Sequence, residues 1–123
     1  MSAGELKALP VEHFQQSAEA LLTITRGSYS SVSGGSYNAA NEYYSSISGG
    51  SHNTTDEDYS SISGGTHNMT SGEHSSISGG AYNVASGDYS SVNGGEQNTA
   101  SGAYTTINGS AELEASAPYS TLP

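Results

Sequence analysis

One aliphatic residue recurs every fifteen positions in an otherwise polar, glycine-rich chain. In most copies a glycine pair follows it closely, and an asparagine stands six positions after it. The aliphatic column consists of Val32, Ile47, Ile62, Ile77, Val92 and Ile107. The asparagine column consists of Asn38, Asn53, Asn68, Asn83 and Asn98. This pattern marks residues 29–118 as six copies of one unit and indicates a repeat architecture.

The fifteen-residue unit is too short for repeats built from helix pairs, which need about 34 residues. A β-branched residue flanked by serines favours a short strand, and the glycine pair favours a turn. A second strand around the Asn-x-Ala segment and a turn at the following Ser-Gly would complete one coil. We therefore predict an all-β parallel β-solenoid of six coils over residues 29–118, with coils about 4.8 Å apart. The repeat decays toward residues 119–123, which are expected to cap the stack.

Alternation along each strand assigns side chains to the inside or the outside of the coil. Ser30, Val32 and Gly34 are predicted to point inward, and Tyr29 outward. The aliphatic and asparagine columns therefore form the predicted core of the solenoid. Two alternatives remain for the asparagines, which are a ladder of side chains inside the stack or a left-handed turn position.

A column of tyrosines lies on the predicted outer surface and is interrupted once, by His74. Its members are Tyr29, Tyr44, Tyr59, Tyr89 and Tyr104. Stacked aromatic rings can stabilise the roll or fill a groove between neighbouring rods. The alternative is a recognition stripe for a sugar or a protein, because tyrosine is common in binding surfaces.

Residues 1–28 do not follow the repeat and are predicted to form a separate N-terminal segment. Val11, Phe14, Leu21 and Leu22 follow helical spacing, and Pro10 suits the first turn of a helix. We therefore expect a short helix or an arm. This segment is predicted either to cap the first coil or to dock to a larger partner through Val11, Phe14, Leu21 and Leu22.

Composition and charge narrow the possible functions. Only 33% of the residues are hydrophobic, which is too few for an ordinary globular core. The net charge of -10, with Lys7 and Arg26 as the only basic residues, argues against nucleic acids and anionic membranes as partners. No stretch reaches the roughly 20 apolar residues of a membrane helix, and no secretory signal is visible. The chain has no cysteine, which excludes disulfides and thiolate metal sites.

Three polar features resemble chemical sites only weakly. His52 and His67 share a column with tyrosines, which favours a variable outward position over a shared metal ion. The run Asp56-Glu57-Asp58 is expected to be a solvated turn rather than a calcium site. No arrangement of serine, histidine and aspartate can be identified from the repeat columns. We therefore predict no catalytic residue, no cofactor and no metal, and no enzymatic activity.

The repeat resembles the head repeats of YadA-type trimeric autotransporter adhesins. The resemblance is carried by Ser31-Val32-Ser33-Gly34-Gly35 with Asn38 and Ala40, and by the run from Ser91 to Gly102. It implies a left-handed parallel β-roll that associates as a homotrimer. Two departures are the longer period and a glycine in place of the family's second aliphatic residue.

A trimeric roll with a non-repetitive N-terminal segment suits a structural role without chemistry. We expect a bacteriophage virion protein, either a capsid decoration (cement) protein or a short fibre. Its partners would be two further copies of the chain and a capsid or tail protein, bound through residues 1–28 at the virion surface. The alternative is an adhesin-like head that binds a host glycan or surface protein in an extracellular or cell-surface setting.

Overall fold

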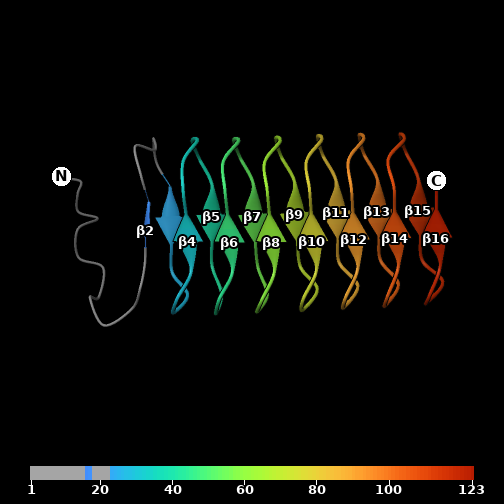
Figure 1. Ribbon diagram of the computed structural model, residues 1–123, viewed down its shortest axis with the longest axis horizontal. Coiled ribbons are helices and arrows are strands. Elements are labelled where there is room, and N and C mark those ends of the chain that lie inside the picture. The colour runs from blue at the N-terminus through green and yellow to red at the C-terminus, as the bar shows by residue number, and fades with distance from the viewer. Residues whose placement is uncertain (1–15, 18–22) are drawn as a thin grey trace.

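The protein is a straight stack of β-coils. The computed structural model describes residues 16–17 and 23–123, which form one rod with its strands across the long axis (Figure 1). All of its regular elements are two-residue strands, and the described residues contain no helix. The prediction of an all-β parallel solenoid with fifteen-residue coils is thereby confirmed.

Two parallel sheets run along the rod, one on each side of the coil. The first sheet contains β2 (Gln16–Ser17), β4 (Ser31–Val32), β6 (Ser46–Ile47), β8 (Ser61–Ile62), β10 (Ser76–Ile77), β12 (Ser91–Val92), β14 (Thr106–Ile107) and β16 (Thr121–Leu122). The second sheet contains β3 (Ile24–Thr25), β5 (Ala39–Ala40), β7 (Thr54–Thr55), β9 (Met69–Thr70), β11 (Val84–Ala85), β13 (Thr99–Ala100) and β15 (Glu114–Ala115). Partners are fifteen residues apart, as in Ile62 with Ile77 and Val84 with Thr99. Each strand therefore pairs with its own equivalent in the next coil.

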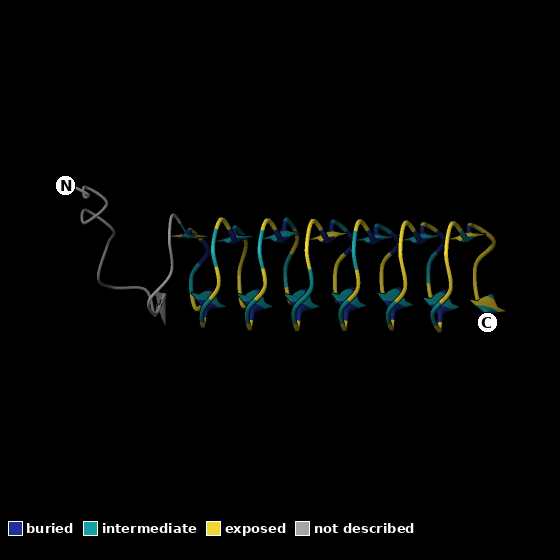
Figure 2. Ribbon diagram, turned by 90° about the horizontal axis from the view of Figure 1, so that it is seen from above, coloured by how far each residue is buried: buried dark blue, intermediate teal, exposed yellow. Residues whose placement is uncertain are grey.

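The core is a thin apolar column between the two sheets. The first sheet contributes the aliphatic residues, among which Val32 and Ile47 are fully buried. The second sheet contributes small residues at the facing position, such as Ala85 and Ala100. The exposed residues lie mainly on the segments that connect the strands (Figure 2). The interior of each coil thus holds one large apolar side chain opposite a small one.

The asparagines lie inside the rod, which decides between the two alternatives left by the sequence. Asn68 is buried, and its side-chain amide donates to the carbonyl oxygens of Gly64 at 3.1 Å and Gly80 at 3.0 Å. Its side-chain oxygen accepts a hydrogen bond from the backbone N–H of Asn83 at 2.9 Å. The asparagine column is therefore a ladder that bonds to backbone groups rather than to other asparagine side chains.

A second set of buried polar groups closes the turn between coils. Except at Ser90, the hydroxyl at the second position of the repeat donates to a carbonyl three residues earlier, as in Ser60 to Glu57 at 2.7 Å and Ser75 to Gly72 at 2.6 Å. Thr105 makes the same bond to Gly102. Serine is suited to this position because a short hydroxyl side chain can bond to nearby backbone.

The parallel ladder begins before Tyr29, the expected start of the solenoid. Ile24–Thr25 pairs with Ala39–Ala40, and Gln16–Ser17 pairs with Ser31–Val32. The backbone at Gln16 and Ser17 is a strand, where the spacing of apolar residues predicts a helix. The other positions of that expected helix lie outside the described residues.

The expected C-terminal cap is a continuation of the stack. Thr121–Leu122 pairs with Thr106–Ile107, so residues 119–123 include a strand of the first sheet. Leu122 and Leu113 are partly buried and pack against the core. Leucine at position 113 replaces the buried asparagine of the preceding coils.

Candidate functional site

Two positions in each coil adopt a left-handed backbone although their residues are not glycine. The first aromatic column is Tyr29, Tyr44, Tyr59, His74, Tyr89, Tyr104 and Tyr119. The second column is Tyr37, His52, His67, Tyr82, Gln97 and Glu112. All of these residues have φ between 55° and 63°. This conformation is disfavoured for residues with a Cβ by roughly 1–2 kcal/mol each, so the surrounding coil must hold it in place.

Hydrogen bonds between coils hold these left-handed residues. The backbone N–H of Tyr59 donates to the carbonyl oxygen of Tyr43 at 2.9 Å, and that of His67 donates to Ser51 at 3.0 Å. Equivalent bonds recur along both columns, for example from Tyr104 to Asp88 at 2.9 Å. From Tyr44 onward the unusual backbone therefore keeps these amides paired while it directs the side chain outward from the turn.

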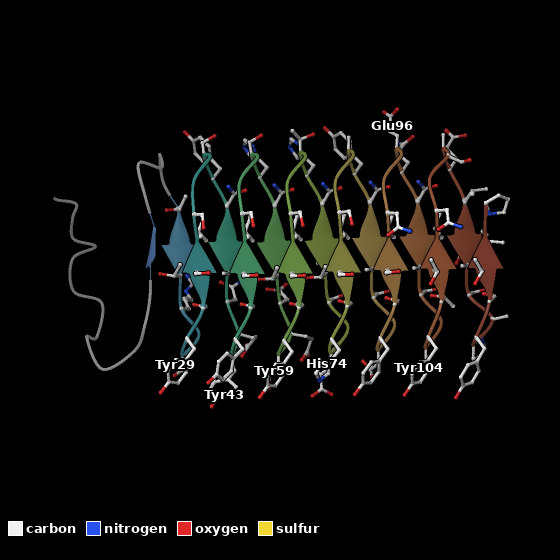
Figure 3. The ribbon with its side chains drawn as sticks, in the orientation of Figure 1. Tyr29, Tyr43, Tyr59, His74, Glu96 and Tyr104 are labelled. Atoms are coloured by element: carbon white, nitrogen blue, oxygen red, sulfur yellow. The ribbon has the colours of Figure 1, made fainter. Side chains whose placement is uncertain are left out.

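The rings of the first aromatic column are stacked face to face along the rod. Centroids of Tyr89 and Tyr104 are 4.9 Å apart with planes 1° from parallel, and Tyr59 and His74 are 4.8 Å apart at 2°. The labelled rings Tyr29, Tyr59 and Tyr104 point away from the ribbon along one edge, opposite Glu96 (Figure 3). Neighbouring rings cover the faces within the column, so the rod presents ring edges and phenol hydroxyls.

This stacking changes what the predicted recognition stripe can do. A sugar binds an aromatic ring through the ring face, and within the column that face is already occupied by the neighbouring ring. The hydroxyls remain accessible, since the side chains of Tyr59 and Tyr89 are exposed. The column is thus suited to hydrogen bonding along its edge rather than to stacking with a ligand.

Tyr43 widens the first aromatic column at one point. Its ring meets the ring of Tyr44 edge to face, with centroids 4.6 Å apart at 85°. It makes similar but longer contacts of 6.0 Å with Tyr29 and Tyr59. Tyr43 lies outside the tyrosine column predicted from the repeat, although the Tyr43-Tyr44 pair is visible in the sequence.

The histidines of the second column stack rather than converge. His52 and His67 have centroids 4.6 Å apart at 6°, between Tyr37 and Tyr82. Among residues 16–17 and 23–123, no group of three or more histidine, aspartate or glutamate side chains is placed to hold a metal ion. The geometry is that of an aromatic stack in which histidine and tyrosine replace one another.

The acidic side chains beside the first column bond to the turns of neighbouring coils. Asp58 accepts a hydrogen bond from the backbone N–H of Tyr43 at 3.2 Å, and Asp88 accepts one from Glu73 at 3.0 Å. Asp56 accepts one from the side chain of Asn41 at 2.6 Å. Two aspartates of the Asp56–Asp58 run therefore serve the packing of adjacent coils.

The outward sides of the two sheets differ in chemistry. The first sheet carries serine, threonine or asparagine, and two of these columns bond along the rod, as in Asn93 to Asn108 at 2.9 Å. The second sheet carries several apolar residues, of which Ile24 and Met69 are more than one third exposed. The second sheet therefore presents the more apolar surface.

Other sequence features add no site. The predicted docking residues Val11, Phe14, Leu21 and Leu22 lie outside the described residues. In the part of the chain that the structure describes, no helix has the length and apolar character needed to cross a membrane.

Neither a protein-family model nor a curated protein matches the chain.

Proposed function

We propose that this chain is a structural rod, attached through its N-terminal segment to a larger particle. The observation that carries the proposal is the use of the polar interior. Buried side chains such as Asn68 and Ser75 form their hydrogen bonds with backbone groups of the rod itself. An interior arranged in this way serves to maintain a repeating shape, and attachment requires no chemistry.

The particle we favour is a bacteriophage virion, with the chain as a capsid decoration (cement) protein or a short fibre. The rod would project from the capsid or tail, or lie across neighbouring subunits. Two of the predicted docking residues, Val11 and Phe14, precede the first strand of the ladder in the chain, so an apolar N-terminal segment could bind through them while the coils stay unchanged. The acidic solenoid supports a display role because net charge keeps exposed surfaces from associating nonspecifically.

The attachment is tested by changing the docking residues in the full chain. We expect Val11→Asp with Phe14→Asp to abolish co-sedimentation with purified particles of the source virus. The matched control is Ser63→Asp with Ser78→Asp, which places the same charges on exposed positions of the solenoid. Equal binding of both double variants to the particles would refute attachment through residues 1–28.

We further propose that the rod associates as a homotrimer through the second sheet. A coil with one large aliphatic residue buries little surface, and a narrow rod benefits from association. The apolar residues on that sheet, such as Met69 at 38% exposure, supply a surface to cover. We expect Met69→Glu with Val84→Glu to dissociate the assembly in light scattering, while Ser78→Glu, directly after β10 of the first sheet, leaves it intact. A wild-type monomer at all concentrations would contradict the trimer.

The alternative function is an adhesin-like head, and the exposed phenol edges favour it. Replacement of Tyr89 and Tyr104 by phenylalanine removes two hydroxyls but keeps the stacked rings. An adhesin that recognises a glycan or protein through this edge should lose ligand binding in that variant. Unchanged binding of the variant to its ligand would exclude the edge as the recognition site.

A further inference from the structure

The first aromatic column brings tyrosines of consecutive coils into ring contact. Four pairs are stacked with centroids between 4.9 and 5.4 Å, namely Tyr29–Tyr44, Tyr44–Tyr59, Tyr89–Tyr104 and Tyr104–Tyr119. Members of each pair are fifteen residues apart in the chain. The ladder that fixes the coils also fixes these pairs, since the backbone N–H of Tyr104 bonds to Asp88 in the preceding coil.

We propose that the stacked tyrosines of the first column are a site of oxidative coupling. In this inference, a one-electron oxidant such as a haem peroxidase with hydrogen peroxide converts a stacked pair to dityrosine. The product joins consecutive coils by a covalent bond. The proposal does not depend on the particle or ligand to which the rod binds.

The coupling reaction requires no group of the protein other than the two phenols. Each phenol loses one electron and its hydroxyl proton, which gives two phenoxyl radicals. The radicals join through a carbon–carbon bond between ring positions next to the hydroxyls, and the displaced ring hydrogens move to the oxygens and restore both phenols. One molecule of hydrogen peroxide accepts the two electrons and two protons and becomes two molecules of water.

Stacking favours this coupling because both radicals are held in contact before they form. Positioning of two reactants replaces a diffusional encounter and is worth many orders of magnitude in effective concentration. The rings must tilt slightly to bond, and the exposed side chains of Tyr89 and Tyr104 have solvent on one side in which to move. Access by an oxidant is also open along this edge.

The second column supplies an internal comparison. Tyr82 is 53% exposed and Tyr104 is 48% exposed, so an oxidant reaches both. Within the second column, Tyr82 stacks on the ring of His67 in the preceding coil. Its neighbour in the following coil is Gln97, which has no ring. Tyr82 therefore has the accessibility for oxidation but lacks a stacked tyrosine to couple with.

The experiment oxidises the full chain with a haem peroxidase and hydrogen peroxide. Dityrosine is detected by its fluorescence, and linked peptides are identified by mass spectrometry through a loss of two hydrogen atoms. Cleavage after acidic residues separates Tyr89 from Tyr104 at Glu96. We expect links between residues fifteen apart, with Tyr89–Tyr104 at least about tenfold more frequent than any link at Tyr82, because only the stacked pair is already positioned.

Substitutions test the role of the column directly. Tyr104→Phe keeps the ring but removes the phenol hydroxyl. This variant should lose the Tyr89–Tyr104 link and the Tyr104–Tyr119 link. Tyr82→Phe is the matched control and should leave the pattern unchanged. His74→Tyr should add links to Tyr59 and Tyr89, because it places a tyrosine between them at the one position of the column where a histidine stands. This gain provides a test even if Tyr104→Phe fails to fold.

Isotope labelling separates coupling within a chain from coupling between chains. An equal mixture of ¹⁵N-labelled and unlabelled protein should give linked peptides of a single isotope composition. The proposal is overturned if Tyr82 links as often as Tyr104, if His74→Tyr adds no link, or if the links are predominantly of mixed composition.

Discussion

The side-chain oxygen of Asn68 accepts a 2.9 Å hydrogen bond from the backbone N–H of Asn83, its equivalent in the next coil. The same contact recurs from Asn53 to Asn68 at 3.0 Å and from Asn83 to Asn98 at 2.9 Å. Each asparagine amide also donates to one carbonyl of its own coil and to one of the next. The buried asparagine therefore joins two coils and uses both of its donor hydrogens.

Asn83→Ala should strongly destabilise the rod. It removes two bonds donated to Gly79 and Gly95 and one accepted from Asn98, and it leaves the N–H of the buried Asn98 without this partner. We expect the free energy of unfolding to fall by about 3 kcal/mol, at about 1 kcal/mol for each lost bond. Urea denaturation followed by circular dichroism measures this change.

The control for the asparagine ladder is Asn93→Ala. Asn93 is exposed, and the one hydrogen bond of its side chain among the described residues goes to the side chain of Asn108. Its replacement should change the free energy of unfolding by less than about 0.5 kcal/mol, as is usual for surface positions. Similar losses in Asn83→Ala and Asn93→Ala would mean that the buried ladder contributes little to stability.

The two glycines of each pair should respond in opposite ways to alanine. Gly65 has φ +91, and a Cβ there would overlap the carbonyl oxygen of Gly80 and crowd the side-chain amide of Asn68. Gly64 has nothing within 4 Å of an added Cβ. We expect Gly65→Ala to lower the free energy of unfolding by roughly 3 kcal/mol, from left-handed strain together with overpacking. Gly64→Ala should be neutral or stabilising by about 0.5 kcal/mol.

Thermal unfolding of both alanine variants separates the two roles of the glycine pair. A large drop in Tm for Gly65→Ala with no drop for Gly64→Ala is the expected result. Comparable drops for both would show that the pair acts through chain flexibility and not through the close approach of Gly65 to the next coil.

Much of this architecture could be predicted from the columns of the repeat. The period predicts the pairing of residues fifteen apart, and the alternation around Val32 predicts the burial of Ser30 and Val32, because a strand has a period of two. The prediction that Gly34 points inward is wrong, because the two-residue strand ends at Val32 and a Cβ at Gly34 would have no atom within 4 Å. The role of the asparagines could not be decided in this way. Asparagine is favoured both in ladders and in left-handed turns, and the turn position proves to be the residue before it, such as His67.

The aromatic columns show a further limit of sequence reasoning. A tyrosine that lies outside the strand can be expected from its place in the repeat, but the left-handed backbone at Tyr89 cannot, because tyrosine has no preference for it. The start of the ladder at Gln16–Ser17 could not be predicted from the sequence either. That segment lacks the aliphatic residue and the glycine pair, so its strand depends on pairing with Ser31–Val32 and not on its own pattern.

Thr70→Val should stabilise the protein. The hydroxyl of Thr70 is buried and has no hydrogen-bond partner in the described part of the chain, at a position where Ala85 stands in the next coil. Valine keeps the shape and removes the unsatisfied group, so the free energy of unfolding should rise by about 1 kcal/mol. Thr54→Val, one coil earlier and directed outward, is the control and should change it by less than about 0.5 kcal/mol. A loss of stability in Thr70→Val would indicate that its hydroxyl is paired in solution.

Gln97→Gly tests how the left-handed positions are stabilised. Gln97 has φ 58 and carries no ring, and its backbone N–H donates to Ala81 at 2.9 Å, a bond that glycine retains. Relief of left-handed strain of about 1 kcal/mol exceeds the cost of about 0.5 kcal/mol for the greater chain entropy of glycine, so a net gain of about 0.5 kcal/mol is expected.

Tyr89→Gly relieves the same strain but should give the opposite result. It removes ring contacts with His74 at 4.8 Å and Tyr104 at 4.9 Å, each worth about 0.5–1.5 kcal/mol. The free energy of unfolding should therefore fall by about 1 kcal/mol, which puts Tyr89→Gly below Gln97→Gly in urea denaturation. If the two glycine variants were equally stable, ring stacking could not be what offsets the left-handed backbone along the first column, and the strain would have to be offset by the bonds between coils alone.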